Sequence, residues 1–241
     1  MTQQHNAAAE AQFERYAVYW TPEQGSPLAE FGRSWLGYDA DTGSPVAQRD
    51  DRGLGLDLLE RITTTPRHYG FHGTLLAPYR LRDGKSAYEL LDRLQRFAAR
   101  RRPVAVGPLQ LEKLFDFLAL VPKNDAPALN ALHAECAFAF DRYWAPLTDD
   151  ERARHQPTEL SHTQRLMLAQ WGYPRMLCDF PFHLTLTGDL EADQSDAITG
   201  KLAANLEDIC GPPLTLESIS LCGDPGSEKP FQVLARFPFD G

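Results

Sequence analysis

The sequence is poor in basic residues and in cysteine, and it contains no long apolar run. Its 24 lysines and arginines face 33 aspartates and glutamates, which gives a net charge of −9 at pH 7. A protein that holds a long nucleic acid by its phosphates needs a continuous basic surface, so this balance argues against that class of protein. A small anionic ligand held by a few local groups remains compatible with it.

The cysteines and the apolar segments exclude further classes. Cys136, Cys178, Cys210 and Cys222 have no CxxC or other metal-type spacing, so we expect reduced, mostly buried thiols. No stretch reaches the roughly 18 apolar residues of a membrane-spanning helix, and the N-terminus lacks a basic start followed by an apolar run. We therefore expect a cytoplasmic, monomeric protein with no membrane association.

The length suits one large domain or two closely packed lobes. With 241 residues, of which 43% are hydrophobic, the chain is long enough to bury a substantial core. Residues 1–14 are expected to form a disordered tail, and residues 15–241 a single bilobal domain.

Apolar periodicity predicts alternating strands and helices. We expect a long surface loop at 39–55, and a hairpin that turns around Phe115 and Asp116. A short helix near 56–62 is expected to stop before Pro66. The other expected helices span 26–36, 86–101, 127–144, 158–171 and 194–209, and the expected strands lie within 15–22, 103–123, 213–223 and 231–239.

A short pattern occurs twice, as YGFHGTLLAP at 69–78 and as PFHLTLTGDL at 181–190. Each copy is followed by the same predicted order of helix, strand and strand. Pro103 follows His72 by 31 residues, and Pro213 follows His183 by 30. The repeated order indicates an internal duplication, with a first motif half at about 66–145 and a second at about 178–241.

Each motif combines one polar face with one apolar face. Side chains at i and i+2 of a strand share a face, so His72 lies with Thr74, and His183 lies with Thr185. If the halves are related by a pseudo-two-fold axis, the two polar faces meet across a cleft. Two imidazoles and two hydroxyls around one point suit cleavage of a phosphodiester without a metal or a cofactor. One imidazole would take a proton from water, the other would protonate the leaving oxygen, and the threonines would donate to phosphate oxygens.

These residues resemble a known family. HGTL at 72–75 and HLTL at 183–186 are similar to the paired H-x-T-x tetrapeptides of the two-histidine (2H) phosphoesterase superfamily, which includes 2′,3′-cyclic nucleotide phosphodiesterases and 2′-5′ RNA ligase-like proteins. RYAVYW, FGRSWLGYD, TPRHYGFHGTL and WGYP resemble its bacterial branch associated with phosphonate-utilisation genes, over nearly the whole chain. The resemblance implies a bilobal α+β fold, with two antiparallel sheets that flank a central cleft and helices outside. It also implies that His183 activates water and that His72 protonates the leaving group.

Three further residues are candidates for substrate binding. Arg67 could hold a second phosphate or a carboxylate, and Tyr69 and Tyr173 could stack on a ring of the substrate. The structural alternatives are a solvated arginine and two tyrosines packed between the lobes.

The expected activity is hydrolysis of a small cyclic phosphodiester, either a 2′,3′-cyclic nucleotide or a ribose cyclic phosphate. Two alternatives stay open: a non-catalytic protein that binds a phosphorylated metabolite or nucleotide, and a 2′-5′ ligase-like protein that acts on RNA ends.

Overall fold

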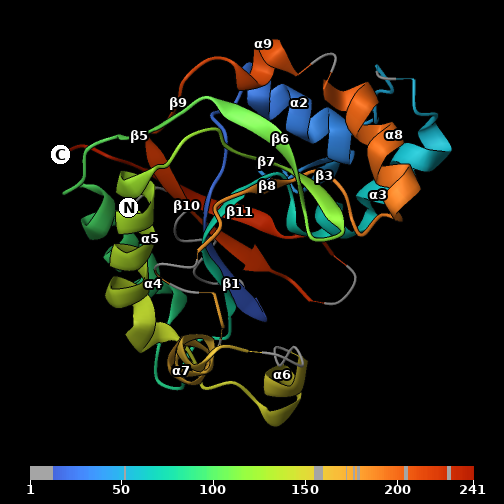
Figure 1. Cartoon of the computed structure of the whole chain (residues 1–241). Helices are drawn as coiled ribbons and strands as arrows, with labels where there is room; N and C mark the ends of the chain where they lie inside the picture. Colours follow the sequence, from blue (N-terminus) through green and yellow to red (C-terminus); the bar gives the residue numbers. More distant parts are fainter. Residues whose placement is uncertain are drawn as a thin grey trace.

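Seven strands form one antiparallel sheet that contains both motifs (Figure 1). The computed structural model describes residues 13–51, 53–154, 160–171, 173–175, 177, 180–203, 206–226 and 229–241. The strand order is β11-β10-β1-β4-β8-β7-β6. These strands are β1 (Arg15–Trp20), β4 (Gly73–Tyr79), β6 (Leu109–Leu114), β7 (Phe117–Pro122), β8 (Leu184–Thr185), β10 (Ser218–Asp224) and β11 (Gln232–Pro238).

Four shorter strands form two separate pairs. β2 (Tyr38–Asp39) pairs with β3 (Ser44–Pro45) inside the segment expected to be a long loop. β5 (Val104–Gly107) pairs with β9 (Leu214–Leu216), and these are the first strands after the helices that follow the two motifs. The pairing of β5 with β9 therefore joins corresponding parts of the two motif halves.

Helices pack at two sides of the sheet. In Figure 1, α4 (Ala87–Ala98) and α5 (Pro127–Phe140) lie at the left, and α5 contacts β4 while α4 contacts β10 and β11. At the upper right lie α2 (Pro27–Leu36), α3 (Leu56–Tyr69), α8 (Ala192–Ala203) and α9 (Glu207–Cys210). The remaining helical elements are η1 (Asp141–Tyr143), α6 (Asp149–Arg154) and α7 (His162–Trp171).

Capping residues set two of the predicted helix starts. The Ser26 side chain accepts from the Ala29 amide at the start of α2. Ser86 and Glu89 form a reciprocal capping box at the start of α4, which satisfies two amides that have no partner inside the helix. Both starts agree with the sequence prediction to within one residue.

The two motif strands are direct neighbours, which corrects the expectation of two separate sheets. β4 pairs with β8 at Gly73 and Leu184, near the middle of the seven-stranded sheet. Gly73 leaves room for the Phe182 ring, because a Cβ at position 73 would lie 2.2 Å from Phe182 Cζ. The α+β class is as predicted, but one continuous sheet contains both motif strands, and each histidine lies directly before its strand.

α3 continues through Pro66, whereas the sequence predicted an end before it. Proline has no N–H to donate to the carbonyl four residues earlier, which is that of Ile62. In the structure the Gly188 amide donates to the Ile62 carbonyl at 2.6 Å. The segment after the second motif thus satisfies the carbonyl that proline leaves free, and the helix is not interrupted.

Other boundaries also differ from the predictions. α5 ends at Phe140 and is followed by η1, and α6 was not predicted. The expected helix at 194–209 is divided into α8 and α9, and residues 204–205 between them lie outside the described residues. Residues 1–12 of the expected tail are also outside them, but the Glu14 amide donates to the Asp224 carbonyl at 2.8 Å, so residue 14 belongs to the fold.

The structure confirms the prediction that the cysteines are mostly buried, for those among the described residues. Cys136 and Cys222 are buried free thiols, Cys210 is buried as well, and Cys178 lies outside the described residues. Within the part of the chain that the structure describes, no helix combines the length and the apolar character needed to cross a bilayer.

Candidate functional site

The register of β4 and β8 brings the two motifs together. Because the strands run antiparallel, the pair Gly73–Leu184 sets His72 opposite Thr185, and Thr74 opposite His183. Cross-strand neighbours of this kind have Cβ atoms roughly 4.5–5.5 Å apart and share one face of the sheet. The four predicted side chains therefore form a square in which histidine and threonine alternate.

Both imidazoles are held in the same way by the backbone. Nδ1 of His72 lies 2.9 Å from the Gly70 carbonyl, and Nδ1 of His183 lies 2.7 Å from the Pro181 carbonyl. A carbonyl only accepts hydrogen bonds, so Nδ1 carries the proton in both rings and Nε2 is the nitrogen free to exchange one. Nε2 of His72 lies 3.1 Å from the Thr74 hydroxyl, which donates to it while the ring is neutral.

Gly70 supplies the carbonyl that orients the first ring. Its φ of 72° lies in the left-handed region, and it ends α3 directly before the motif. A Cβ at this position would also lie 2.9 Å from the Ala40 side chain. The glycine is therefore required both by the turn and by the close approach of the neighbouring segment.

A cavity of about 270 Å³ opens beside this square, and of the four motif side chains His72 and Thr185 line it, whereas Thr74 and His183 do not. That volume is at the lower end of small-molecule sites, so it suits a small metabolite. Among the lining residues Asp189 alone is charged, and two aromatic rings, Tyr69 and Phe117, face the space. The lining consists of Thr65, Pro66, Tyr69, Gly70, His72, Phe117, Thr185, Thr187, Gly188 and Asp189.

Burial lowers the pKa of both motif histidines. The pKa of His72 falls to about 4, because burial disfavours the charged ring and His183 adds a like charge, against a smaller opposite effect of the Gly70 carbonyl. Burial also lowers the pKa of His183, again partly opposed by its carbonyl partner, Pro181. Both rings are therefore neutral near pH 7, and an entering anion would favour protonation of one of them.

Arg67 lies behind the site, within α3. Its Nε donates to the Leu36 carbonyl at 2.6 Å, and its Nη2 donates to Gln48 and Thr63, each at 3.1 Å. These bonds fasten the segment after α2 to α3, and Arg67 is not among the residues that line the cavity. Its role in substrate binding stays a prediction, and the structure adds a structural role.

The two predicted tyrosines are in different places. Tyr69 lines the cavity, with its ring centroid 5.4 Å from that of Phe231. Tyr173 packs against the main core, where burial raises the pKa of its hydroxyl, and it does not line the cavity. Of the two, the structure brings Tyr69 alone next to the motif square.

Several residues beside the histidines were missed by the sequence analysis. Tyr19 stacks on His72, and Phe117 lies beside His183. Thr187 and Asp189 line the cavity. The alternation His183, Thr185, Thr187 within one extended segment was the signal for Thr187. Tyr19 and Phe117 come from strands whose neighbours the sequence did not identify.

His133 has a structural role, because it links the two motifs. Its Nδ1 donates to the Leu75 carbonyl at 2.7 Å, and its Nε2 accepts from the Leu177 amide at 3.1 Å. The ring also stacks on Phe180, with centroids 3.6 Å apart. Both ring nitrogens are thereby used, and the segment before the second motif is attached to β4.

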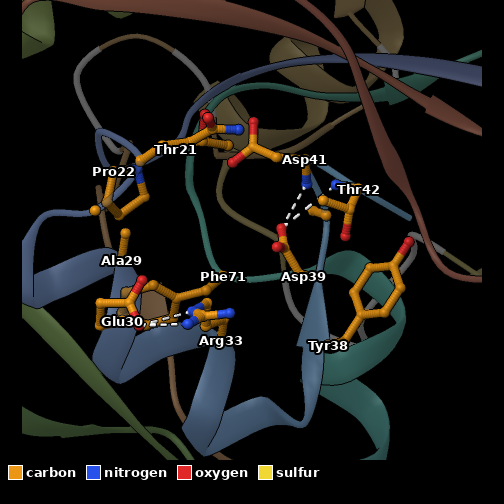
Figure 2. A pocket seen from close by; sticks show the side chains of 13 residues that line it. Thr21, Pro22, Ala29, Glu30, Arg33, Tyr38, Asp39, Asp41, Thr42 and Phe71 are labelled. Atoms are coloured by element: carbon orange, nitrogen blue, oxygen red, sulfur yellow. Dashed lines mark hydrogen bonds and ion pairs between the residues drawn. The ribbon is translucent and has the colours of Figure 1, made fainter. Parts of the chain in front are cut away.

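A second cavity of about 270 Å³ contains no histidine (Figure 2). Its charged groups are already paired: Arg33 bonds Glu30 at 2.5 Å, Arg236 bonds Asp41 at 3.1 Å, and Asp39 accepts from the Asp41 and Thr42 amides. Phe71 lines this cavity, whereas the next residue, His72, lines the first. The described residues contain no group of three or more His, Cys, Asp or Glu side chains arranged to hold a metal ion.

Comparisons with known proteins give a family and two curated relatives. The model of a family described as "Protein of unknown function (DUF1045)" matches residues 74–232. A protein of Janthinobacterium sp. (strain Marseille) named "Ribose 1,5-bisphosphate phosphokinase PhnN" is 34% identical over 231 residues, which cover 94% of this chain and 51% of the relative. A protein of the same name from Laribacter hongkongensis (strain HLHK9) is 29% identical over 220 residues, 91% of this chain and 50% of the relative. The chain thus spans about half the length of the curated relatives it matches.

Proposed function

Because the chain belongs to the DUF1045 family of proteins of unknown function, we propose its activity from the site itself: hydrolysis of a small cyclic phosphodiester by a pair of histidines. The observation that carries this proposal is the pairing of β4 with β8, which sets two imidazoles and two hydroxyls on one face, with His72 and Thr185 lining a small cavity. The similar backbone support of the two rings also favours a duplicated, pseudo-two-fold origin of the halves.

The reaction needs one proton acceptor and one proton donor. Nε2 of one histidine takes a proton from water, and the water oxygen forms a bond to phosphorus. The bond from phosphorus to one ester oxygen breaks, and the protonated Nε2 of the other histidine gives its proton to that oxygen. Thr74 and Thr185 donate to the non-bridging oxygens, where charge accumulates. Solvent then restores the two protonation states, so a cyclic diester and water yield one phosphomonoester.

The names of the relatives point to the alcohol part of the ester. Both are called kinases of ribose 1,5-bisphosphate. Opening a cyclic phosphate that joins O1 and O2 of ribose 5-phosphate, at the bond to O2, gives that bisphosphate. The resemblance to the phosphonate-linked branch points to the same class of sugar phosphate. We therefore place a ribose 1,2-cyclic phosphate ahead of a 2′,3′-cyclic nucleotide as the substrate.

A kinase activity of this chain has less support, although the relatives' names favour it. The phosphate-binding loop G-x-x-x-x-G-K-[S/T] is one way in which kinases hold a nucleotide. The chain has GKS at 84–86, but Tyr79 occupies the position of the first glycine. In addition, Ser86 caps α4, and Lys85 faces Glu89 with Nζ 3.6 Å from its carboxylate. The kinase reaction accordingly fits better with the half of the relatives that this chain does not match.

The test is a substrate panel with matched variants. It contains ribosyl 1,2-cyclic phosphates with and without a 5-phosphate, 2′,3′-cyclic nucleotides and 2′-5′ dinucleotides, assayed in EDTA with products identified by phosphorus NMR. We expect His72→Ala and His183→Ala to lower turnover by roughly 10²–10⁴-fold, which is the usual contribution of acid–base catalysis. His162→Ala, an exposed histidine at the start of α7, is the control. Equal turnover by parent and double variant would refute the proposal, and tight binding without turnover would favour a binding protein.

A further inference from the structure

The two histidines have similar backbone partners but different aromatic neighbours. Tyr19 of β1 stacks on His72, with ring centroids 3.6 Å apart and planes 17° from parallel. Phe117 of β7 lies beside His183 at 5.6 Å, with the planes inclined by 45°. The motifs are nearly symmetric in sequence, but His72 is distinguished from His183 by its closely stacked ring, as well as by its contact with Thr74 and its place in the cavity lining.

The position of Tyr19 is fixed by the sheet. It lies in register with Thr74 of β4 on one side and with Ser220 of β10 on the other. The side chain is 1% exposed and packs with Ala17, Cys222 and Phe231. A ring held by two neighbouring strands and a packed cluster cannot turn away from His72.

An aromatic face favours a cation placed over it. The ring carries negative potential on its faces, and it attracts a cation placed there most strongly when water is excluded. The titratable groups near His72 from other elements are His183, directly before β8, which opposes protonation, and Tyr69 of α3 and Asp189, which line the same cavity. A negative charge on Asp189 would add to the preference for a protonated His72. Beyond Tyr19, Arg15 and Asp224 form an ion pair at 2.6 Å, so their charges largely offset each other. Burial opposes protonation of His72, and a bound phosphate would supply the opposing charge.

We propose that Tyr19 is a positioning residue that holds the His72 ring beside Thr74 and selectively favours its protonated form. His72 then gives its proton to the leaving oxygen, while His183, which lacks such a stack, receives the proton of water. The destinations of the protons rest on the proposed function, but the effect of Tyr19 on His72 does not.

The first experiment measures protonation without turnover. The titration of each imidazole is followed by NMR in the parent protein, with inorganic phosphate as the probe. Phenylalanine and then increasingly fluorinated phenylalanines replace Tyr19 by site-specific incorporation, because fluorination weakens the ring's negative face with little change in size. We expect the titration midpoint of His72 to fall stepwise, by about one pH unit in the most fluorinated protein, since one unit corresponds to about 1.4 kcal/mol. The midpoint of His183 should stay constant and is the internal control.

Kinetics then test the consequence for the reaction. The alkaline limb of the pH profile of kcat should move to lower pH with fluorination, and kcat at a fixed pH above that limb should fall roughly tenfold while KM changes little. Tyr19→Phe should resemble the parent, because both rings bind a cation on their faces. A constant His72 midpoint across the series, equal shifts of both histidines, or a loss in Tyr19→Phe as large as that of the fluorinated proteins would overturn the inference. Absence of turnover in the parent, with the NMR series as expected, would instead refute the proposed function alone.

Discussion

Gly73 occupies the x position of the first H-x-T motif, and the structure leaves no space there for a methyl group. A Cβ at position 73 would lie 2.2 Å from Phe182 Cζ and 2.4 Å from Phe182 Cε2, far inside van der Waals contact. Phe182 is 5% exposed and therefore has little room to move. Gly73→Ala should thus force apart β4 and β8 at the point where they pair.

The expected cost follows from overpacking, which typically destabilises by about 1–3 kcal/mol. A loss of about 2 kcal/mol in the free energy of unfolding lowers Tm by roughly 4–8 °C in a protein of this size. Because the same pair sets His72 opposite Thr185, turnover should decline together with stability.

The assay is thermal and urea denaturation of four proteins: the parent, Gly73→Ala, Phe182→Leu and the double variant. Phe182→Leu removes the atoms that the new methyl group meets, so the two changes should be coupled favourably by about 0.5–3 kcal/mol. Gly200→Ala is the control for the chemical change itself, because Gly200 lies in α8 with nothing within 4 Å of a Cβ. That variant should be stabilised by up to about 1 kcal/mol. If Gly73→Ala were as stable as the parent, or if the double variant showed no coupling, the packing argument would be wrong.

Three further predictions concern charge and hydrogen bonding. Burial lowers the pKa of His133 to about 4, so between about pH 6.5 and 4 the unfolded chain binds more protons than the folded one, and stability decreases as the pH is lowered. His133→Gln can still donate to Leu75 and accept from Leu177, and it should show a smaller loss of Tm between pH 7.5 and 5 than the parent. An equal loss in both proteins would contradict this. Burial lowers the pKa of His72 and His183, so the protein should take up a proton when inorganic phosphate binds at pH 7. Calorimetry in buffers of different ionisation enthalpy would detect this uptake, and binding heats that do not depend on the buffer would disprove it. Arg67→Lys cannot maintain three hydrogen bonds in the same geometry and should lower Tm with KM unchanged, whereas a raised KM at unchanged Tm would support the predicted contact with substrate.

Local features of the fold were predictable from sequence because local chemistry determines them. Ser26 and Ser86 marked helix starts, since each supplies an oxygen for amides that a helix leaves without partners. The hairpin at Phe115 was also found, and that residue takes a φ of 55° at the turn. The shared face of His72 and Thr74 follows from strand alternation alone.

Strand order was not predictable, because it depends on contacts between residues far apart in the chain. Nothing local indicates that β1 lies between β4 and β10, and so the stacking of Tyr19 on His72 could not be found. The same limit applies to α3, because the carbonyl left free before Pro66 is satisfied by Gly188, more than a hundred residues later. Arg67 looked available in the sequence because its three acceptors lie in other segments or on the preceding turn of its own helix.

Adjacency of β4 and β8 has a consequence for how a ligand enters. Two groups on neighbouring hydrogen-bonded strands keep a separation set by the interstrand repeat of about 4.8 Å, and no hinge can change that separation without breaking the ladder. Opening and closing must therefore come from the rim, through side chains such as Tyr69 and Asp189 or the hairpin that carries Phe117. The spacing of the catalytic groups is therefore rigid, and substrate selection depends on the side chains and the hairpin that surround them.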